Sequence, residues 1–436
     1  MSNPTTARLP EGFLWGVAMA GHQNEGDSTA SDIWFLEHTE PTIFREPSGP
    51  ACRTWELWER DLDLAAGLGL TAFRFSVEWA RVEPAPGEFS AEALDHYEAV
   101  VDGCLERGMA PIVTFSHFAA PHWFAVHGSW ASEDAPELFA RYCGVVAERF
   151  ADRIALAVTL NEPNLVQMLI SGNVLPPEAE EAKRAMLDAA SRATGAERYR
   201  CANVFLEEEL PEFQAALTEV HRAARAAIKA HRADLPVGLS IAVTDEYALP
   251  GGEAGRDRKR AEVYDHWLRL AREDDFVGVQ NYERIAHGPD GPVPPEPGAA
   301  VNGMGTAVEP DSLAGAVAYA HRVAGVPVLV SEHGMSTEDD DLRADFIEPS
   351  LAGLAGEVER GVPVLGYCHW TLLDNYEWVA GYHSKLGLHS VDRQTFERRP
   401  KRSAGVYRDA VLRYREASAD AAPRQQEAER TVPVVR

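Results

Sequence analysis

The sequence lacks the features of a protein that crosses or enters a membrane. None of its apolar runs reaches about 18 residues, the length that a membrane-spanning helix needs. The N-terminal segment, MSNPTTAR, has no apolar core of the kind found in secretory signal peptides. We therefore predict a cytoplasmic protein without a membrane partner.

The chain has few cysteines, and its basic residues are fewer than its acidic residues. The five cysteines are scattered, odd in number and free of CxxC spacing, which argues for reduced thiols and against a disulfide framework or a zinc site. Lysine and arginine number 41 against 68 aspartates and glutamates, so the formal net charge is −27. Because binding to polyanions needs clustered basic side chains, this charge disfavours DNA, RNA and anionic membranes as partners. We expect a solvated acidic surface instead.

The 436 residues suffice for two or three domains or for one large α/β barrel. Short apolar runs alternate with stretches whose apolar residues recur every three or four positions, as in amphipathic helices. The predicted strands are 13–17, 72–76, 110–115, 154–160, 236–242, 275–280, 326–331 and 362–369, and the predicted helices include 54–67, 91–107, 135–150, 212–231, 311–324 and 342–360. These units predict a single closed α/β barrel, the (β/α)8 TIM barrel, with its active site at the carboxyl ends of the strands. An open doubly wound sheet is the alternative, but no GxGxxG motif or P-loop follows any strand.

Three segments interrupt this alternation. Residues 175–209 form a charged, alanine-rich insertion after the fourth strand, which we predict to be helical. Residues 286–305 are rich in glycine and proline and predict a long loop over the barrel mouth. Residues 417–436 are polar and poor in aromatics, which predicts a disordered tail after a catalytic barrel that spans 9–416.

Two glutamates stand where strands of this barrel are expected to end. Glu162 and Glu332 each follow an apolar run and are followed by a turn-forming residue, Pro163 or Gly334. Cleavage of a glycosidic bond needs an acid that protonates the leaving oxygen and, in a retaining enzyme, a carboxylate nucleophile about 5–5.5 Å away. We predict Glu162 as the acid and Glu332 as the nucleophile. Arg74, a charge between bulky apolar neighbours, must be paired, and we predict that it keeps Glu332 ionised.

The other strand ends carry polar and aromatic side chains. Gln23 follows the first strand, His117 the third, Gln280 and Tyr282 end the sixth, and the stretch HWTLLDNYEW at 369–378 follows the eighth. Sugar sites combine polar groups for the hydroxyls with aromatic faces for the C–H surface of the ring. The strand ends together predict a sugar-binding pocket.

With these motifs in order from about Leu9 to Asp392, the chain resembles glycoside hydrolase family 1, the β-glucosidase family of retaining (β/α)8 barrels. The resemblance implies a small-molecule β-glycoside as substrate, Glu162 as acid/base, Glu332 as nucleophile, and no metal or organic cofactor. The implied contacts are Arg74 and Tyr282 to the nucleophile, Gln23, His117, Asn161, Glu377 and Trp378 to the sugar, a stacking platform at Trp370, and Gln280 on the same strand face as Tyr282. A register that would place Glu283 beside Glu332 is rejected, because two uncompensated carboxylates would repel each other.

Some positions depart from the family pattern. Phosphosugar members have a serine and basic residues where this chain has Glu377 and Trp378, so we expect an unphosphorylated sugar; glucose, galactose and fucose stay open. Thr306 stands where a tryptophan usually stacks on the leaving group, and the segments 175–209 and 286–305 are altered as well. We therefore predict a dedicated aglycone or activity mainly on small aryl glycosides.

Two other functions stay open at the level of sequence. A transglycosidase would use the same glycosyl-enzyme intermediate, with an acceptor alcohol in place of water. A non-catalytic sugar-binding barrel would require the loss of Glu162, Glu332 or Arg74, and all three are present. The sequence does not indicate an oligomeric state.

Overall fold

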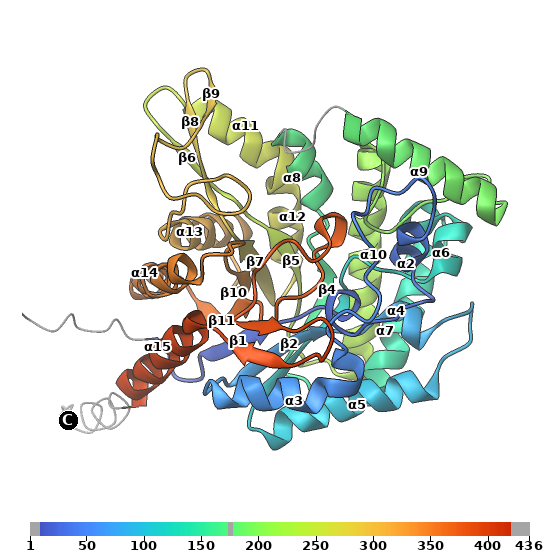
Figure 1. The fold of residues 1–436 in the computed structure, drawn as a ribbon, viewed down its shortest axis with the longest axis horizontal. Helices are drawn as coiled ribbons and strands as arrows, with labels where there is room; N and C mark the ends of the chain where they lie inside the picture. Colours follow the sequence, from blue (N-terminus) through green and yellow to red (C-terminus); the bar gives the residue numbers. More distant parts are fainter. Residues whose placement is uncertain (1–8, 173–177, 420–436) are drawn as a thin grey trace, which may run out of the picture.

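Parallel strands close into a barrel at the centre of the molecule (Figure 1). The structure is a computed structural model that describes residues 9–172 and 178–419. Around the barrel the strands follow the order β1-β11-β10-β7-β5-β4-β3-β2, and β2 pairs with β1 to close the ring. Their bounds are β1 Leu14–Ala18, β2 Ala72–Ser76, β3 Ala110–Ser116, β4 Leu156–Asn161, β5 Val237–Ala242, β7 Phe276–Asn281, β10 Val328–His333 and β11 Val364–Trp370. The predicted (β/α)8 barrel is confirmed.

Helices surround the barrel and connect its strands (Figure 1). The long ones are α3 Thr54–Gly67, α5 Ala91–Glu106, α7 Ala135–Phe150, α9 Glu178–Thr194, α10 Leu210–His231, α13 Ser312–Ala324, α14 Asp340–Glu359 and α15 Arg402–Ala419. Shorter ones are α1 Gly21–Asn24, α2 Asp32–Glu37, α4 Trp79–Val82, α6 His122–His127, α8 Leu165–Ser171, α11 Glu253–Val263 and α12 Asp265–Leu270, with 3-10 turns η1 Ser129–Ala131, η2 Glu207–Glu209, η3 Ala271–Glu273 and η4 Trp378–Ala380. The six predicted helices are present, with bounds at most two residues away.

Three barrel strands begin two residues later than their apolar runs predict. β10 and β11 start directly after Pro327 and Pro363, and proline has no N–H to donate to a neighbouring strand. Before β4, the apolar Ile154 is buried without being part of the strand. Apolar runs therefore mark the buried floor of the barrel as well as its strands.

Of the three segments that interrupt the alternation of strands and helices, 286–305 and 175–209 have a structure that differs from the predicted one. Within the predicted loop 286–305, residues up to 293 belong to β8 Arg284–Gly288 and β9 Gly291–Val293, which form a small sheet with β6 Asp245–Ala248. Pro289 and Asp290 make the hairpin turn between β8 and β9, where the sequence predicts a long loop. Of the predicted helical insertion, only α9 is a long helix, and residues 195–206 are irregular.

The predicted tail 417–436 lies mostly outside the described residues. Its first three residues, 417–419, still belong to α15, because the amphipathic pattern of that helix continues through them. Residues 420–436, the N-terminal segment 1–8 and the link 173–177 are outside the described part of the chain. The domain bounds 9–416 and 417–436 stay a prediction.

The barrel strands are buried on both faces, and glycine allows them to approach each other. In β7, a Cβ atom on Gly278 would lie 2.0 Å from Ser240 Oγ of β5. In β5, a Cβ atom on Gly238 would lie 2.2 Å from the carbonyl oxygen of Phe276. These contacts exclude any side chain at either position, and they fix the register of β5 against β7.

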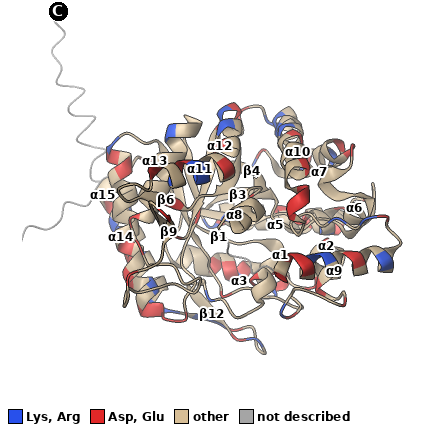
Figure 2. Ribbon diagram, turned by 90° about the horizontal axis from the view of Figure 1, so that it is seen from above, with Lys and Arg blue, Asp and Glu red and all other residues tan. Residues whose placement is uncertain are grey.

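The surface carries charges of both signs. Figure 2 shows acidic and basic positions interspersed on the outer helices. A small antiparallel ribbon, β12 His389–Val391 with β13 Arg398–Pro400, lies on the return from β11 to α15. Among residues 9–172 and 178–419, no helix combines the length and the apolar character needed to cross a membrane.

Candidate active site

Glu332 lies on β10 at the carboxyl end of the barrel, where two side chains bind its carboxyl group. Arg74 on β2 donates from Nη1 to Glu332 Oε1 at 2.5 Å and to the Ser331 carbonyl oxygen at 3.2 Å. Tyr282, one residue beyond β7, donates its hydroxyl to Glu332 Oε2 at 2.5 Å. Arg74 and Glu332 are buried, and both bonds stabilise the ionised carboxylate.

Glu162 stands directly after β4 in a backbone conformation that is rare outside glycine, with φ at +44°. Its N–H donates to the Ser240 carbonyl oxygen of β5 at 2.8 Å, which fixes this turn on the neighbouring strand. The Glu162 side chain lines the same cavity as Glu332. Within the described residues no lysine or arginine forms an ion pair with Glu162, whereas Glu332 has Arg74.

The carboxyl groups of Glu162 and Glu332 differ in the partners that compensate for the burial of their charge. Burial raises the pKa of Glu162 well above its usual range, and the charge of Glu332 raises it further. Burial also raises the pKa of Glu332, but Arg74 and the Tyr282 hydroxyl lower it again. Because only Glu332 has these partners, Glu332 ionises first and Glu162 keeps the proton. The pair Glu162 and Glu332 thus consists of one carboxylic acid and one carboxylate.

Asn161, the last residue of β4, connects Arg74 with Gln280 and His117. Its Oδ1 accepts from Arg74 Nη2 at 2.6 Å and from Gln280 Nε2 at 2.7 Å. Its Nδ2 lies 3.4 Å from His117 Nε2, and burial lowers the pKa of His117 well below its usual range, so the ring is neutral. Arg74 is further held by Thr114, whose Oγ1 accepts from Nε at 3.1 Å.

Gln23 and Glu377 form a second polar group in the cavity. Gln23 Nε2 donates to the Tyr376 carbonyl oxygen at 2.9 Å and to Glu377 Oε1 at 3.2 Å, and Trp370 Nε1 donates to the same Oε1 at 3.4 Å. Burial raises the pKa of Glu377 to about 8, against the lowering effect of the Trp370 and Gln23 bonds. Gln23 Oε1 is buried without a partner in the described part of the chain. It is therefore free to accept from a bound hydroxyl.

Aromatic rings stand parallel beside these polar groups. The His117 ring lies 5.7 Å from Trp370 and 6.3 Å from Trp378, with interplanar angles of 9° and 12°. His22 supports Trp378 from another side at 5.4 Å and 8°. The polar and aromatic residues that the sequence predicts for sugar binding are thus gathered at one place.

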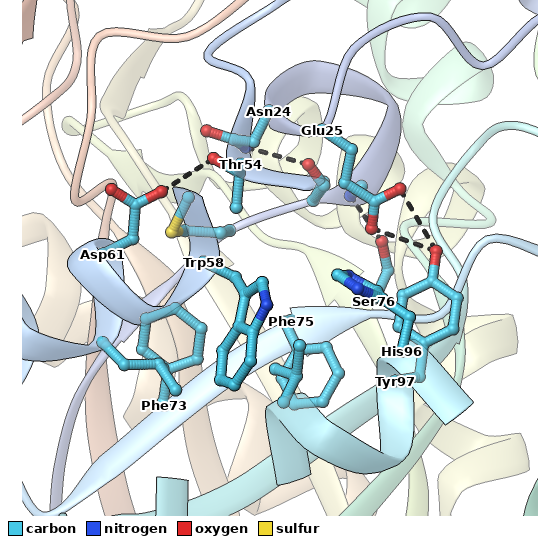
Figure 3. Close-up of a pocket in the computed structure, with 15 residues that line it drawn as sticks. Asn24, Glu25, Thr54, Trp58, Asp61, Phe73, Phe75, Ser76, His96 and Tyr97 are labelled. Carbon is cyan, nitrogen blue, oxygen red and sulfur yellow. Dashed lines mark hydrogen bonds between the residues drawn. The ribbon is translucent and has the colours of Figure 1, made fainter. Parts of the chain in front are cut away.

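The short helix α1, which carries Gln23, is anchored from beneath (Figure 3). Glu25, directly after α1, accepts from the Tyr97 hydroxyl at 3.0 Å and pairs with Arg81 at 2.6 Å. The Gly21 N–H donates to Ser76 Oγ at 2.8 Å. The cavity drawn in Figure 3 has a volume of only about 30 Å³, too small for a sugar, so this region supports the site rather than binding substrate.

The cavity that contains both glutamates has a volume of about 230 Å³. Of the predicted site residues, Gln23, His117, Glu162, Gln280, Tyr282, Glu332, Trp370, Glu377 and Trp378 line it, while Arg74 and Asn161 lie behind them. Its further lining includes Phe118, Leu165, Met168, Leu169, Ala242, Val243, Thr244, Glu283, Asn302, Met304, Ser336, Ser384 and Leu386. No residue of 178–209 lines it, and α9 instead packs against α2 through Met186 and Leu187.

The sequence interpretation missed two kinds of contact. Thr114, three positions before His117, places a polar side chain in an apolar run, but this pattern does not identify Arg74 as its partner. Glu283 was not detectable, because strand alternation from Gln280 and Tyr282 turns it away from the cavity. The chain leaves β7 after Asn281, so alternation no longer applies at Glu283, and its side chain lines the cavity.

The described residues contain no group of three or more histidine, cysteine, aspartate or glutamate side chains placed to hold a metal ion. All five cysteines are buried and unpaired. Burial raises the pKa of the Cys368 thiol on β11 to about 12. The acid–base groups of the cavity are therefore its carboxyl groups.

Known proteins resemble this chain in sequence and in structure. The sequence profile of glycosyl hydrolase family 1 matches residues 5–208 and 300–415. The chain is 29% identical to β-glucosidase A of Thermotoga maritima, over 93% of this chain and 98% of that protein, and 30% identical to a β-glucosidase of Agrobacterium sp., over 93% and 96%. The crystal structure of the β-glycosidase BGL167 superimposes with a TM-score of 0.87 at 46% identity, covering 93% of this chain and 97% of that one.

Proposed function

The chain belongs to glycosyl hydrolase family 1 and is a glycoside hydrolase, and from this premise we propose that it hydrolyses unphosphorylated β-glucosides with retention, with Glu332 as nucleophile and Glu162 as acid/base. The observation that carries this proposal is the contrast between the two glutamates. Glu332 is bound by Arg74 and Tyr282, while Glu162 lines the same cavity without a basic partner in the described residues. A retaining glycosidase needs one carboxylate and one carboxylic acid of this kind.

In the first step, a carboxylate oxygen of Glu332 attacks the anomeric carbon of the sugar. The bond from that carbon to the leaving oxygen breaks, and Glu162 transfers its proton to this oxygen, so that the aglycone departs as a neutral alcohol. Tyr282 and Arg74 bind Glu332 before the attack and orient it. The product of the step is a glycosyl ester on Glu332.

In the second step, Glu162 acts as a base. Once Glu332 is esterified, its negative charge no longer raises the pKa of Glu162, so the Glu162 carboxyl releases its proton more readily. The ionised Glu162 takes a proton from water while the water oxygen attacks the anomeric carbon and the ester bond breaks. Two inversions at this carbon give net retention.

Glu377 supports the preference for an unphosphorylated sugar. Its carboxyl group is partly buried in the cavity beside Gln23, and no lysine or arginine lines this cavity in the described part of the chain. A sugar phosphate in this position would meet a carboxyl group and no cation to neutralise it. A neutral hydroxyl, in contrast, has both Glu377 and Gln23 as hydrogen-bond partners. The sugar hydroxyls of glucose match such a polar pair.

The two roles are tested with Glu332→Gln, Glu162→Gln and aryl β-glucosides of different leaving ability. Glu332→Gln should lose on the order of 10⁴-fold or more in kcat/KM on every glucoside, since it cannot form the ester. Glu162→Gln should lose about 10²–10⁴-fold on 4-methylphenyl β-glucoside. It should lose far less in bond cleavage of the 2,4-dinitrophenyl glucoside, whose departing oxygen needs no proton.

Added azide separates acid/base loss from misfolding. Azide attacks the ester on Glu332 without a general base, so it should accelerate Glu162→Gln and yield the β-glucosyl azide, and it should leave the wild type unaffected. Activity of the wild type on none of the glucosides, or undiminished activity of Glu332→Gln, would overturn the proposal. Product analysis with added methanol distinguishes hydrolysis from transglycosylation.

A further inference from the structure

Glu283 places a carboxyl group in the part of the cavity that no mechanistic step uses. It lines the cavity together with Glu162 and Glu332, one residue beyond Tyr282. It lies in the stretch 209–299, which the family profile does not match. Position 283 therefore lies outside the part of the chain that the family profile matches.

The backbone of Glu283 is held in place by the neighbouring elements. Its carbonyl oxygen accepts from the Asp245 N–H at 3.1 Å and from Asn281 Nδ2 at 3.1 Å. The next residue, Arg284, pairs with Asp245 at 2.7 Å across the β6–β8 sheet, which stands at one end of the molecule beside α11 (Figure 1). Glu283 is thus fixed before any ligand binds, which reduces the entropic cost of binding.

The Glu283 carboxyl group has no counter-charge bound to it. It forms no ion pair within the described residues, and the nearby Lys259 donates instead to the Met168 carbonyl oxygen at 3.3 Å. Burial raises the pKa of Glu283, and Glu246 raises it further, while Thr306 and Lys259 act in the opposite direction. A cation in the cavity would relieve this cost of burial.

Apolar side chains line the cavity beside Glu283, together with the polar Thr244, Asn302 and Ser336. α8 contributes Leu165, Met168 and Leu169 to the same cavity, and Met304 from the segment after β9 is more than half exposed at its mouth. Every charged side chain among the lining residues is a glutamate. A ligand that complements this wall has an apolar body and a positive charge.

We propose that Glu283 makes this enzyme selective for β-glucosides whose aglycone is an apolar body that carries a protonated amine. The inference rests on the proposed function, because the aglycone occupies this wall only when the glucose ring lies between Glu162 and Glu332. The ammonium group donates to Glu283, and the apolar body packs against α8.

The test compares 4-(aminomethyl)phenyl β-glucoside, protonated at pH 7, with the neutral 4-ethylphenyl β-glucoside in wild type and Glu283→Gln. A charge-assisted hydrogen bond in a partly exposed site predicts that the ratio of kcat/KM, amine over neutral, falls about tenfold or more in the variant. The neutral glucoside should be hydrolysed within about threefold of wild type, because its wall contacts are apolar. The ratio of the two substrates cancels any general effect of the substitution on folding.

Glu262→Gln is the matched control. It removes one carboxylate from α11, near Lys259 but outside the cavity, and should leave the ratio unchanged. An equal loss on both substrates in Glu283→Gln, or an unchanged ratio, would overturn the inference while the proposed function stands. If the wild type fails to hydrolyse the neutral glucoside, the proposed function itself fails.

Discussion

Glu162 and Glu332 share one cavity, yet only Glu332 is bonded to a guanidinium and a phenol. The sequence indicates both residues through their positions after apolar runs, and it indicates that Arg74 needs a partner because its neighbours are bulky and apolar. It does not indicate Thr114 as a further partner of Arg74, because a threonine in a strand is common for reasons of packing alone. At the scale of residues, the sequence predicted which residue types stand at the site. It predicted only some of their hydrogen-bond partners.

Removal of the Glu332 charge should lower the pKa of Glu162. Glu332 is the largest cause after burial of the raised pKa of Glu162, and Glu332→Gln keeps the shape of the side chain without its charge. Titration of Glu162 by ¹³C NMR, with labelled glutamate and Glu162→Gln for assignment, should therefore show a lower pKa in Glu332→Gln than in wild type. The same direction is expected when Glu332 is trapped as a fluoroglycosyl ester. An unchanged Glu162 titration in both would contradict the proposed second step.

At the scale of elements, strands and long helices follow from periodicity, but irregular segments do not. The segment 195–206 after α9 shows this, because side chains of distant elements hold it, among them Trp130 and Asp32. Asp32, the first residue of α2, accepts from the Ile33 and Ala120 N–H groups through Oδ1, at 2.8 and 2.9 Å. Its Oδ2 accepts from the Ala202 N–H at 2.9 Å. No local pattern links these three segments, so the sequence predicted a helix where the structure has a tethered loop.

Asp32→Asn should destabilise the protein by about 1–3 kcal/mol, because its amide group would face an N–H donor and leave a buried bond unmade. Denaturant unfolding measures this change as a lower midpoint. The control is Asp188→Asn, which removes a carboxylate from the exposed face of α9 and should change the midpoint little. Equal midpoints for the two variants would show that Asp32 does not hold the loop.

The small β6-β8-β9 sheet is the second departure at this scale. Its glycines and prolines suggested a loop, and the hairpin forms because β8 pairs with both β6 and β9. The strand β6 follows β5 after two residues, so the pairing depends on where β5 and β7 end side by side in the barrel. This placement carries Glu283 into the cavity.

At the scale of the whole molecule, buried acids outside the active site affect how stability depends on pH. Glu78, beneath α1, is buried; its Oε1 accepts from Ser76 Oγ at 2.8 Å, and its Oε2 has no partner in the described part of the chain. Burial and the charge of Glu25 raise the pKa of Glu78 to about 7, from an ordinary value of 4.5. The folded state therefore holds this proton more tightly than the unfolded chain does.

The unfolding free energy should consequently fall as pH rises from about 4.5 to 7, by on the order of 3 kcal/mol for this one group. Glu78→Gln has no such titration, so its stability should decline less steeply over this interval. Urea unfolding at pH 5, 6, 7 and 8 measures the difference, and Glu88→Gln, at an exposed position, serves as the control. Parallel curves for wild type and Glu78→Gln would contradict the prediction. The cytoplasmic location and the oligomeric state are whole-molecule properties that stay a prediction and an open question.

The sequence by itself determined the eight strands, the long helices between them and the two glutamates at strand ends, because periodicity and turn chemistry act within a few residues. Barrel closure alone decided which side chains meet: Arg74 reaches Glu332 although 258 positions separate them in the chain. It also decided that the Glu283 side chain lines the cavity, although strand alternation predicts that this side chain points away from it. The reason is that alternation holds only inside a strand, whereas contacts across the barrel depend on register and on where each strand ends.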